Sequence, residues 1–190
     1  MVNKIIALLT LILLSPILGA IALLVGKPYW YNPRMIGEKG KPFKMYKFRS
    51  MVYDCDTAVH RNHLADIILH RKPNKKLVSD PRITPIGRIL RKHSLDELPQ
   101  LINVLRGEMN IIGPRPSTEY EWAMYPDWAR GRTDIKPGLT GLWQISKRDS
   151  GTFEEMIKLD LWYIENRNMA VDLYILIMTV VVVLAGIGGR

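Results

Sequence analysis

The sequence has little cysteine and relatively few acidic residues. Its 190 residues include one cysteine, Cys55, so no intrachain disulfide can form and a disulfide-stabilised secreted domain is excluded. His60, His63 and His70 are spaced unlike a zinc site, and we interpret them as surface residues. Lysine and arginine number 27 against 18 acidic residues, a formal net charge of +9. This surplus indicates an anionic partner, such as nucleic acid, a lipid headgroup or a phosphate-bearing substrate.

Two long stretches, residues 5–25 and 173–189, contain no charged residue. The sequence between them has ordinary globular composition, and the whole chain is 47% hydrophobic and 24% charged, so it is neither disordered nor low in complexity. Its length is typical of one modest domain. We therefore expect a membrane-embedded segment at residues 1–26, a globular domain at 27–170 and an apolar interfacial segment at 171–190.

The first apolar stretch would span ~30 Å as a straight helix, which matches the hydrocarbon thickness of a bilayer. Pro16 at its middle removes one backbone hydrogen bond and predicts a bend, and Ser15 can bond to the carbonyl that is freed. A cleaved signal peptide would have a shorter apolar core and a small-residue cleavage site. Two alternatives remain: a kinked single span, and a re-entrant hairpin that enters and leaves the same leaflet.

Basic residues flank this stretch on both sides. Residues 26–50 contain seven lysines and arginines and one glutamate, and Lys4 precedes the stretch. Because positive residues stay in the cytoplasm, we expect the globular domain to face the cytosol. A hairpin satisfies both basic flanks, whereas a straight span satisfies one, so the flanks favour the hairpin and the single span stays open. The C-terminal stretch is shorter than the ~20 residues of a span, and it predicts an interfacial or buried helix, with a strand at the valines 180–183 as the alternative.

Residues 41–51, KPFKMYKFRSM, alternate well enough to predict a strand with Met45, Lys47 and Arg49 on one face. The alternative is an edge strand whose basic residues only keep it soluble. Farther along the chain, the apolar spacing after Pro85 predicts a helix with Arg91 on its polar side.

Ser94 and Glu97 have the spacing of a capping box, followed by apolar residues at helical intervals and by Gly107. This pattern predicts a helix that presents Asp96 and Glu97 at its positive end, which favours ionised carboxylates. A neighbouring Asp–Glu pair also offers hard oxygen ligands suited to Mg²⁺. Acidic residues in a first turn usually only cap the helix. Glu97 fits that duty, which leaves Asp96 as the functional candidate.

Three further basic or acidic residues stand out. Arg115 lies between two prolines in GPRP (113–116), a rigid setting that can present a guanidinium to phosphate, or a turn with a solvated arginine. Lys136 begins KPGLTG (136–141), which predicts a stiff loop with exposed backbone amides. Thr152 and Glu155 form a second capping box, and Asp160 in the helix that follows is a substrate or metal group or the partner of a nearby base.

The stretch SLDELPQLINVLRG (94–107), which continues through EMNIIGPRP, closely resembles the bacterial sugar transferase family, the monotopic polyprenyl-phosphate phosphoglycosyltransferases. The resemblance extends to YKFRSM (46–51), DPRIT (80–84), KPGLTGLWQIS (136–146) and FEEMIKLDLWYIEN (153–166). Nearly the whole chain is covered by motifs in the same order, and it looks like the family's minimal catalytic unit.

The resemblance implies transfer of a sugar 1-phosphate from a UDP-sugar to polyprenyl (undecaprenyl) phosphate, which releases UMP and begins a bacterial glycan pathway. It implies that Asp96 is the nucleophile, with Glu97 beside it, Mg²⁺ bound through Asp96, and a membrane helix broken at Ser15–Pro16. The reaction would occur on the cytoplasmic face of the bacterial inner membrane, with no nucleic acid partner beyond the nucleotide donor. The remaining substrate-binding candidates are Lys47, Arg49, Arg91, Arg115, Lys136 and Asp160.

The expected fold is α+β and mostly helical, with a re-entrant helix, a small β-hairpin and interfacial helices around a cytosol-facing site. Two other functions stay open: a membrane-tethered basic binding protein, and a Mg²⁺-dependent phosphohydrolase that uses the same acidic residues.

Overall fold

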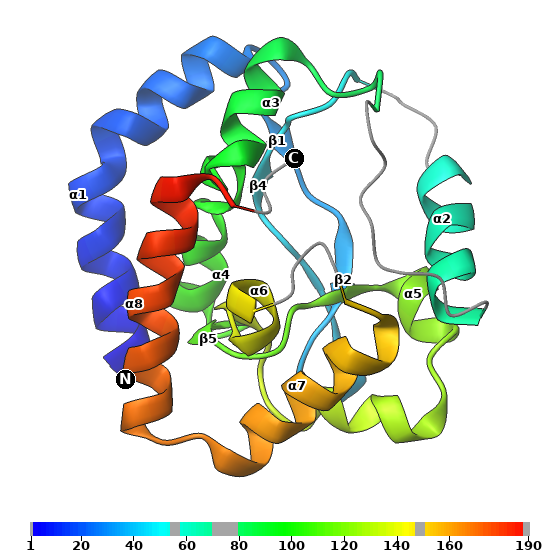
Figure 1. Ribbon diagram of the computed structural model, residues 1–190. Coiled ribbons are helices and arrows are strands. Elements are labelled where there is room, and N and C mark those ends of the chain that lie inside the picture. The colour runs from blue at the N-terminus through cyan, green and yellow to red at the C-terminus, as the bar shows by residue number, and fades with distance from the viewer. Residues whose placement is uncertain (1, 54–57, 70–79, 147–150, 188–190) are drawn as a thin grey trace.

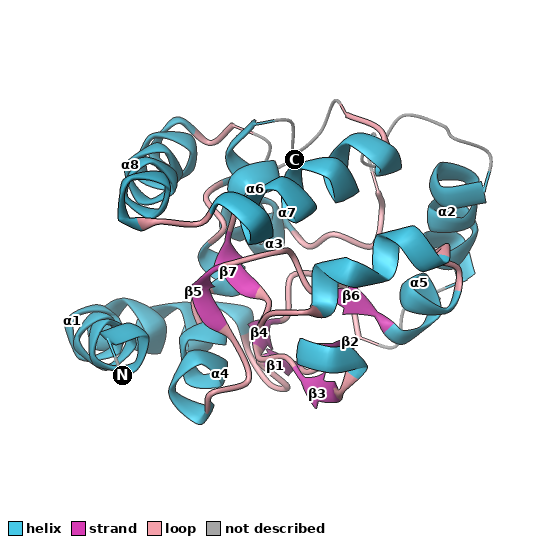
Figure 2. Cartoon of the chain, turned by 90° about the horizontal axis from the view of Figure 1, so that it is seen from below, coloured by secondary structure: helices cyan, strands magenta, loops and turns pink. Residues whose placement is uncertain are grey.

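The computed structural model describes residues 2–53, 58–69, 80–146 and 151–187, so Cys55 and His70 lie outside the described residues. It is a mostly helical α+β structure with short strands in three small sheets, which confirms the expected class (Figures 1 and 2). The helices are α1 (Val2–Val25), α2 (Ala58–Leu69), α3 (Pro85–Lys92), α4 (Gln100–Arg106), α5 (Glu119–Ala123), α6 (Leu142–Ser146), α7 (Phe153–Asn166) and α8 (Met169–Ala185). Three 3-10 turns are η1 (Glu38–Gly40), η2 (Leu95–Glu97) and η3 (Asp127–Thr133).

The strands are β1 (Trp30–Tyr31), β2 (Arg34–Ile36), β3 (Pro42–Lys44), β4 (Lys47–Phe48), β5 (Asn110–Ile112), β6 (Ser117–Thr118) and β7 (Gly138–Thr140). β2 and β3 form an antiparallel hairpin, which β6 extends, and β1 pairs with β4. β5 and β7 run parallel. The small hairpin that the sequence predicted is therefore present, at β2 and β3.

α1 is one helix that continues through Pro16. The hydroxyl of Ser15 donates to the carbonyl of Ile12 at 2.8 Å, the carbonyl that the missing N–H of Pro16 leaves without its helical donor. This confirms the predicted role of the serine. Within the described residues, α1 is the helix that is long and apolar enough to cross a membrane by length and composition.

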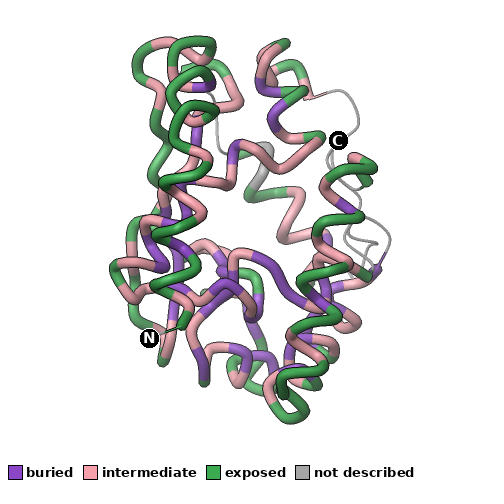
Figure 3. Tube along the Cα trace, turned by 90° about the vertical axis from the view of Figure 1, so that its left-hand side faces the viewer, coloured by how far each residue is buried: buried purple, intermediate pink, exposed green. Residues whose placement is uncertain are grey.

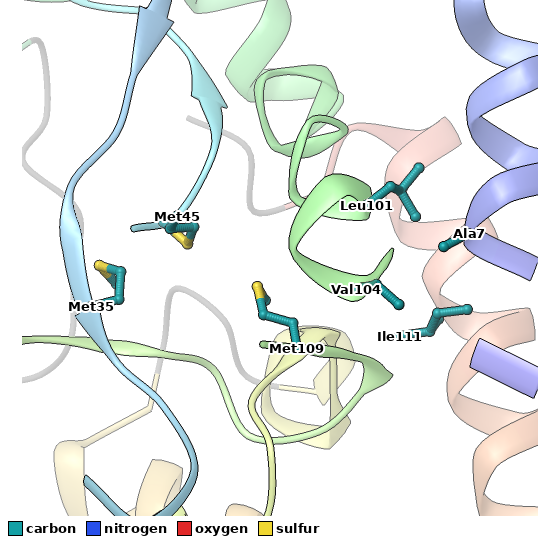
Figure 4. Close-up of a cluster of buried hydrophobic side chains, with 7 residues drawn as sticks. All are labelled: Ala7, Met35, Met45, Leu101, Val104, Met109 and Ile111. Carbon is teal, nitrogen blue, oxygen red and sulfur yellow. The ribbon is translucent and has the colours of Figure 1, made fainter. Parts of the chain in front are cut away.

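Both halves of α1 contact the globular domain. Near its start, Ala7 is fully buried against α4 and β5, in a cluster that also includes Met35 and Met45 (Figure 4). Near its end, Ile21 packs with Phe48 and Leu90. The helix therefore runs along the domain rather than away from it, and its other side stays exposed (Figures 1 and 3).

The C-terminal stretch forms α8, so its helical alternative is confirmed over the strand. α8 packs on α6, β5 and β7, and its Ile175 and Val182 are buried. Many of its other apolar residues, such as Leu173, Ile177 and Leu184, are exposed. α1 and α8 lie on the same side of the molecule, which consequently exposes two apolar helices (Figures 1 and 2).

The single strand predicted at residues 41–51 is wrong, because the chain breaks between β3 and β4. The side chain of Asn103 in α4 accepts from the backbone N–H of Tyr46 at 2.9 Å and donates to the carbonyl of Lys44 at 2.7 Å. These bonds satisfy backbone groups that would otherwise belong to a continuous ladder. Met45 is thereby turned into the core, while Lys47 continues on β4.

The loop predicted at residues 136–141 is also wrong, since Gly138–Thr140 is strand β7. Gly138 is buried, and its N–H donates to the carbonyl of Pro114 at 2.9 Å. A Cβ on Gly138 would lie 2.1 Å from the backbone nitrogen of Gly113. Glycine is therefore needed for the close approach of these two backbones, and the amide of Gly138 is not exposed as expected.

Candidate active site

The Asp96–Glu97 pair lies in the turn η2, between α3 and α4. Ser94 precedes the turn with φ 53° and ψ 22°, a left-handed conformation that is uncommon for serine. Its side chain makes no capping bond, and α4 begins only at Gln100, after Pro99. The predicted capping box at Ser94 and Glu97 is therefore wrong. A capping serine has extended backbone, and the left-handed turn at Ser94 excludes that geometry.

Lys47 binds both carboxylates of the pair. Its Nζ lies 3.2 Å from Oδ2 of Asp96 and 3.0 Å from Oε1 of Glu97. The side chains of Lys47, Asp96 and Glu97 are 19%, 5% and 21% exposed. Burial of the ammonium lowers the pKa of Lys47, but the charges of Asp96 and Glu97 outweigh this effect, so the pKa is raised overall. Lys47 consequently stays protonated at neutral pH.

A pocket opens beside this ion-paired cluster. Glu97 and Lys47 line it together with Arg115 of the GPRP turn, and the remaining lining residues are Met35, Met45, Gln100, Pro116, Gly138, Leu139 and Gln144. Asp96 is not a lining residue, but it is buried and pairs with Lys47, which lines the pocket. Lys47 and Arg115 place two cations at the same pocket. The structure therefore brings together four predicted site residues: Lys47, Asp96, Glu97 and Arg115.

The backbone carbonyl of Arg115 is bound by a buried polar network. Arg132 of η3 donates to the carbonyl of Arg115 at 2.7 Å, and it forms an ion pair with Asp160 of α7. It also donates to the hydroxyl of Tyr125 at 2.6 Å, which in turn donates to Glu121 at 2.6 Å. The side chains of Arg132 and Asp160 are each 2% exposed. The partner of Asp160 is thus an arginine distant in sequence.

Burial dominates the electrostatics of Asp160. It raises the pKa of this carboxyl to about 6, although the charges of Arg132 and Arg115 act in the opposite direction. The charge of Asp160 also raises the pKa of Arg132, which remains a cation. At neutral pH the side chains of Arg132 and Asp160 form a buried ion pair, and Arg132 also binds the backbone of Arg115.

Three basic residues among the predicted substrate-binding candidates, Arg49, Arg91 and Lys136, do not line this pocket. The guanidinium of Arg49 lies 5.8 Å from the ring centroid of Tyr53. Arg91 lies in the last turn of α3, and its charge adds to the effect of Arg82 in lowering the pKa of Asp80. Nζ of Lys136 lies near Gly107, 3.9 Å from the position that a Cβ on this glycine would take. Gly107 caps the C-terminal end of α4, ~10 Å along the helix from its first residue, Gln100.

The described residues contain no cluster of three or more His, Cys, Asp or Glu side chains that could enclose a metal ion. Asp96 and Glu97 nevertheless supply two adjacent carboxylates next to the pocket. Mg²⁺ usually keeps several waters and binds through one or two carboxylates together with substrate phosphates. The pair fits that kind of site, once Lys47 no longer occupies the position between the two carboxylates.

Sequence reasoning missed Gln144, Tyr125 and Arg132. For Tyr125 a local signal existed in its partner, because Thr118 and Glu121 form a capping box that starts α5 and positions Glu121, to which Tyr125 donates. For Gln144 the available signal was a single polar side chain in the otherwise apolar run LWQI (142–145). Arg132 had no local signal, since its partners come from other parts of the chain.

The family model described as bacterial sugar transferase matches residues 1–186. The exopolysaccharide production protein ExoY of Sinorhizobium fredii is 39% identical over 184 residues, which cover 94% of this chain and 81% of that protein. The undecaprenyl-phosphate galactose phosphotransferase of Salmonella typhimurium is 43% identical over 84% of this chain. The UDP-glucose:undecaprenyl-phosphate glucose-1-phosphate transferase of Escherichia coli is 38% identical over 93% of it. The aligned regions are only 34% and 38% of these last two relatives.

Proposed function

Because this chain belongs to the bacterial sugar transferase family, we propose that it transfers a sugar 1-phosphate from a UDP-sugar to undecaprenyl phosphate, a polyprenyl phosphate. The products are an undecaprenyl-diphosphate sugar and UMP, and the reaction begins a bacterial glycan pathway. The names of the Salmonella and E. coli relatives support this assignment. The observation that carries it is the pocket in which Lys47 and Arg115 lie beside the Asp96–Glu97 pair.

Phosphoryl transfer depends mainly on positioning and on neutralising phosphate charge. Lys47 and Arg115 place two cations at the pocket, a suitable arrangement for a diphosphate. The ammonium of Lys47 is paired with both carboxylates. We expect the donor's phosphates to draw Lys47 away from Asp96, because the diphosphate carries more negative charge than either carboxylate.

We assign the nucleophile to Asp96, whose carboxylate would be uncovered by that movement of Lys47. A carboxylate oxygen of Asp96 forms a bond to the sugar-bearing phosphorus, and the bond from this phosphorus to the bridging oxygen breaks, so UMP leaves. The resulting aspartyl-phosphosugar is then attacked by a phosphate oxygen of the polyprenyl phosphate, which releases the Asp96 carboxylate. Atoms and charge balance over the two steps.

Asp96, with Glu97 beside it, would hold Mg²⁺ together with phosphate oxygens of the donor. When bound, the ion would neutralise charge on the diphosphate. Asp160 is a positioning residue in this proposal, since its hydrogen-bonded path to Arg115 runs through Arg132. Arg49, Arg91 and Lys136 lie outside the pocket lining, and we assign them to the attraction of anionic substrates towards it.

We further propose that α1 is re-entrant, and that residues 27–170 face the cytoplasm from the inner membrane while 171–190 lie at its surface. Support comes from the packing of α1, since Ala7 and Ile21 both contact the globular domain. In a straight span these two residues would differ in depth by ~20 Å, and the domain could not contact both from one side. Asn3→Cys in a Cys55→Ser background tests this proposal. A re-entrant helix leaves the introduced thiol unlabelled by impermeant maleimide in intact spheroplasts and labelled in lysed ones, whereas labelling in intact spheroplasts would refute it.

The enzymatic proposal is tested by a panel of UDP-sugars with undecaprenyl phosphate, scored by acceptor-dependent UMP release. Asp96→Asn should abolish sustained transfer, because a neutral amide cannot act as the nucleophile. A donor labelled at the sugar-bearing phosphate should leave label on the unsubstituted protein and none on Asp96→Asn. UMP release that continues without acceptor would indicate a phosphohydrolase. Full transfer by Asp96→Asn would refute the assignment of the nucleophile.

A further inference from the structure

Gln144 lines the pocket, and its neighbours in the short helix α6 fix this helix against the core. Trp143 is buried in the cluster formed with Tyr125 and Phe153. Leu142 and Ile145 pack on a different cluster, around Tyr163 and Ile175. These contacts hold α6 on two sides. Gln144 is left to line the pocket that Lys47, Glu97 and Arg115 also line.

The side-chain carbonyl of Gln144 lacks a partner. Among the described residues, its Oε1 is the one buried side-chain nitrogen or oxygen atom that accepts or donates no hydrogen bond. A buried amide oxygen without a donor costs ~1–3 kcal/mol relative to its hydrated state. A polar group of this kind in a pocket indicates a ligand that supplies the missing donor.

The chemistry of the donor substrate limits what that partner can be. Ionised phosphate oxygens only accept hydrogen bonds, so they cannot bond to a carbonyl oxygen, whereas Lys47 and Arg115 can donate to them. The donor groups of a nucleotide sugar are the hydroxyls of its two sugars and an N–H of its base. An amide carbonyl beside two cations therefore suits a ligand that combines a diphosphate with hydroxyl or N–H groups.

We propose that Gln144 is a substrate-binding residue whose Oε1 accepts a hydrogen bond from a hydroxyl or N–H of the nucleotide sugar. This inference rests on the proposed function and adds a recognition contact to it. The contact selects for the donor, because a ligand without the matching group would leave the carbonyl unpaired. Discrimination of this kind is strong where a pocket is built to bond a polar group.

The test is Gln144→Met, which keeps the length of the side chain and removes the amide. The KM for the UDP-sugar should rise about tenfold, the effect of about one lost hydrogen bond. The melting temperature should stay equal or rise, because the substitution removes an unpaired buried acceptor. Asn166→Leu is the matched control. It removes an exposed amide at the end of α7 and should leave the KM unchanged.

Equilibrium binding of the UDP-sugar to Asp96→Asn protein, with and without Gln144→Met, measures the same contact without turnover. Inhibition by UMP distinguishes the two sources of the donor group. A parallel loss of UMP affinity in Gln144→Met places the contact on the uridine, whereas unchanged UMP affinity places it on the transferred sugar.

The inference is overturned if the unsubstituted protein is active and Gln144→Met binds the donor within twofold of it. Failure of the proposed function has a different result: the unsubstituted protein releases no UMP with any UDP-sugar.

Discussion

The buried pair Arg132–Asp160 gives the sharpest test of how the pocket is held. Arg132→Met removes donors to Asp160, to the hydroxyl of Tyr125 and to the carbonyl of Arg115. It leaves the carboxylate of Asp160 buried without its cation. Asp160→Asn is the milder change. Burial already disfavours the charged carboxyl by raising its pKa to about 6, and the amide oxygen can still accept from Arg132.

The expected losses of stability follow from this difference between Arg132→Met and Asp160→Asn. Removing one partner of a buried ion pair costs ~3–5 kcal/mol, a large part of the ~5–15 kcal/mol that stabilises a typical domain. For a chain of this size each kcal/mol shifts the melting temperature by ~2–4 °C, so Arg132→Met should lower it by ~6–20 °C. Asp160→Asn should cost less. The double variant should be more stable than Arg132→Met alone by ~1–3 kcal/mol, because no unpaired carboxylate remains.

The assay is thermal unfolding of the purified proteins in one detergent or nanodisc, with UMP release measured in parallel. UMP release by the double variant should stay low, since the carbonyl of Arg115 lacks its donor even when stability is regained. This separates a positioning role of Arg132 from a purely stabilising one. The reasoning is refuted if Asp160→Asn further destabilises the Arg132→Met protein, or if the double variant recovers full activity.

Three other predictions concern the same region. Below pH 6 protonation of Asp160 should reduce UMP release, and Asp160→Asn should remove this dependence from the pH profile. Because the pKa of this acid is higher in the folded protein than its ordinary 3.8, its protonation stabilises the fold. As the pH is lowered from 6 to 4, the melting temperature of the unsubstituted protein, measured relative to that of Asp160→Asn, should therefore stay equal or rise. Gly138→Ala should cost ~3 kcal/mol or more in thermal unfolding, because its Cβ would lie 2.1 Å from the backbone nitrogen of Gly113; Gly19→Ala, with open space around it, should cost nothing. Ser94→Val should cost ~1–3 kcal/mol in thermal unfolding and slow UMP release, because a β-branched residue is strained at a φ of 53°.

Much of the secondary structure could be predicted because its signals are local. Thr152 and Glu155 form the predicted capping box at the start of α7. The bond from Ser15 to Ile12 follows directly from the proline beside it. Ser94 shows the limit of such patterns, since the Ser–Glu spacing of a capping box occurs there without the backbone that capping needs.

The structure brings together only part of the predicted set of site residues, because residue types can be recognised in a sequence more easily than their geometry. Asp96, Glu97, Lys47 and Arg115 come together as the chemistry of phosphate suggests. Asp160 is instead buried on Arg132, and nothing near it in the sequence indicates that partner. The amide oxygen of Gln144 lacks a hydrogen-bond partner because of the way α6 packs, and no local sequence pattern indicates this.

The sequence by itself determined the charge-free stretch inside α1, the basic surplus and the two prolines beside Arg115, because each depends on neighbouring residues or on composition alone. Tertiary structure decided which charges meet. Lys47 reaches Glu97 across 50 positions of the chain, and β7 pairs with β5 only because Gly113 and Gly138 let two backbones touch. Ion pairs and backbone contacts act over a few ångströms, so they are set by which distant segments the core packs together.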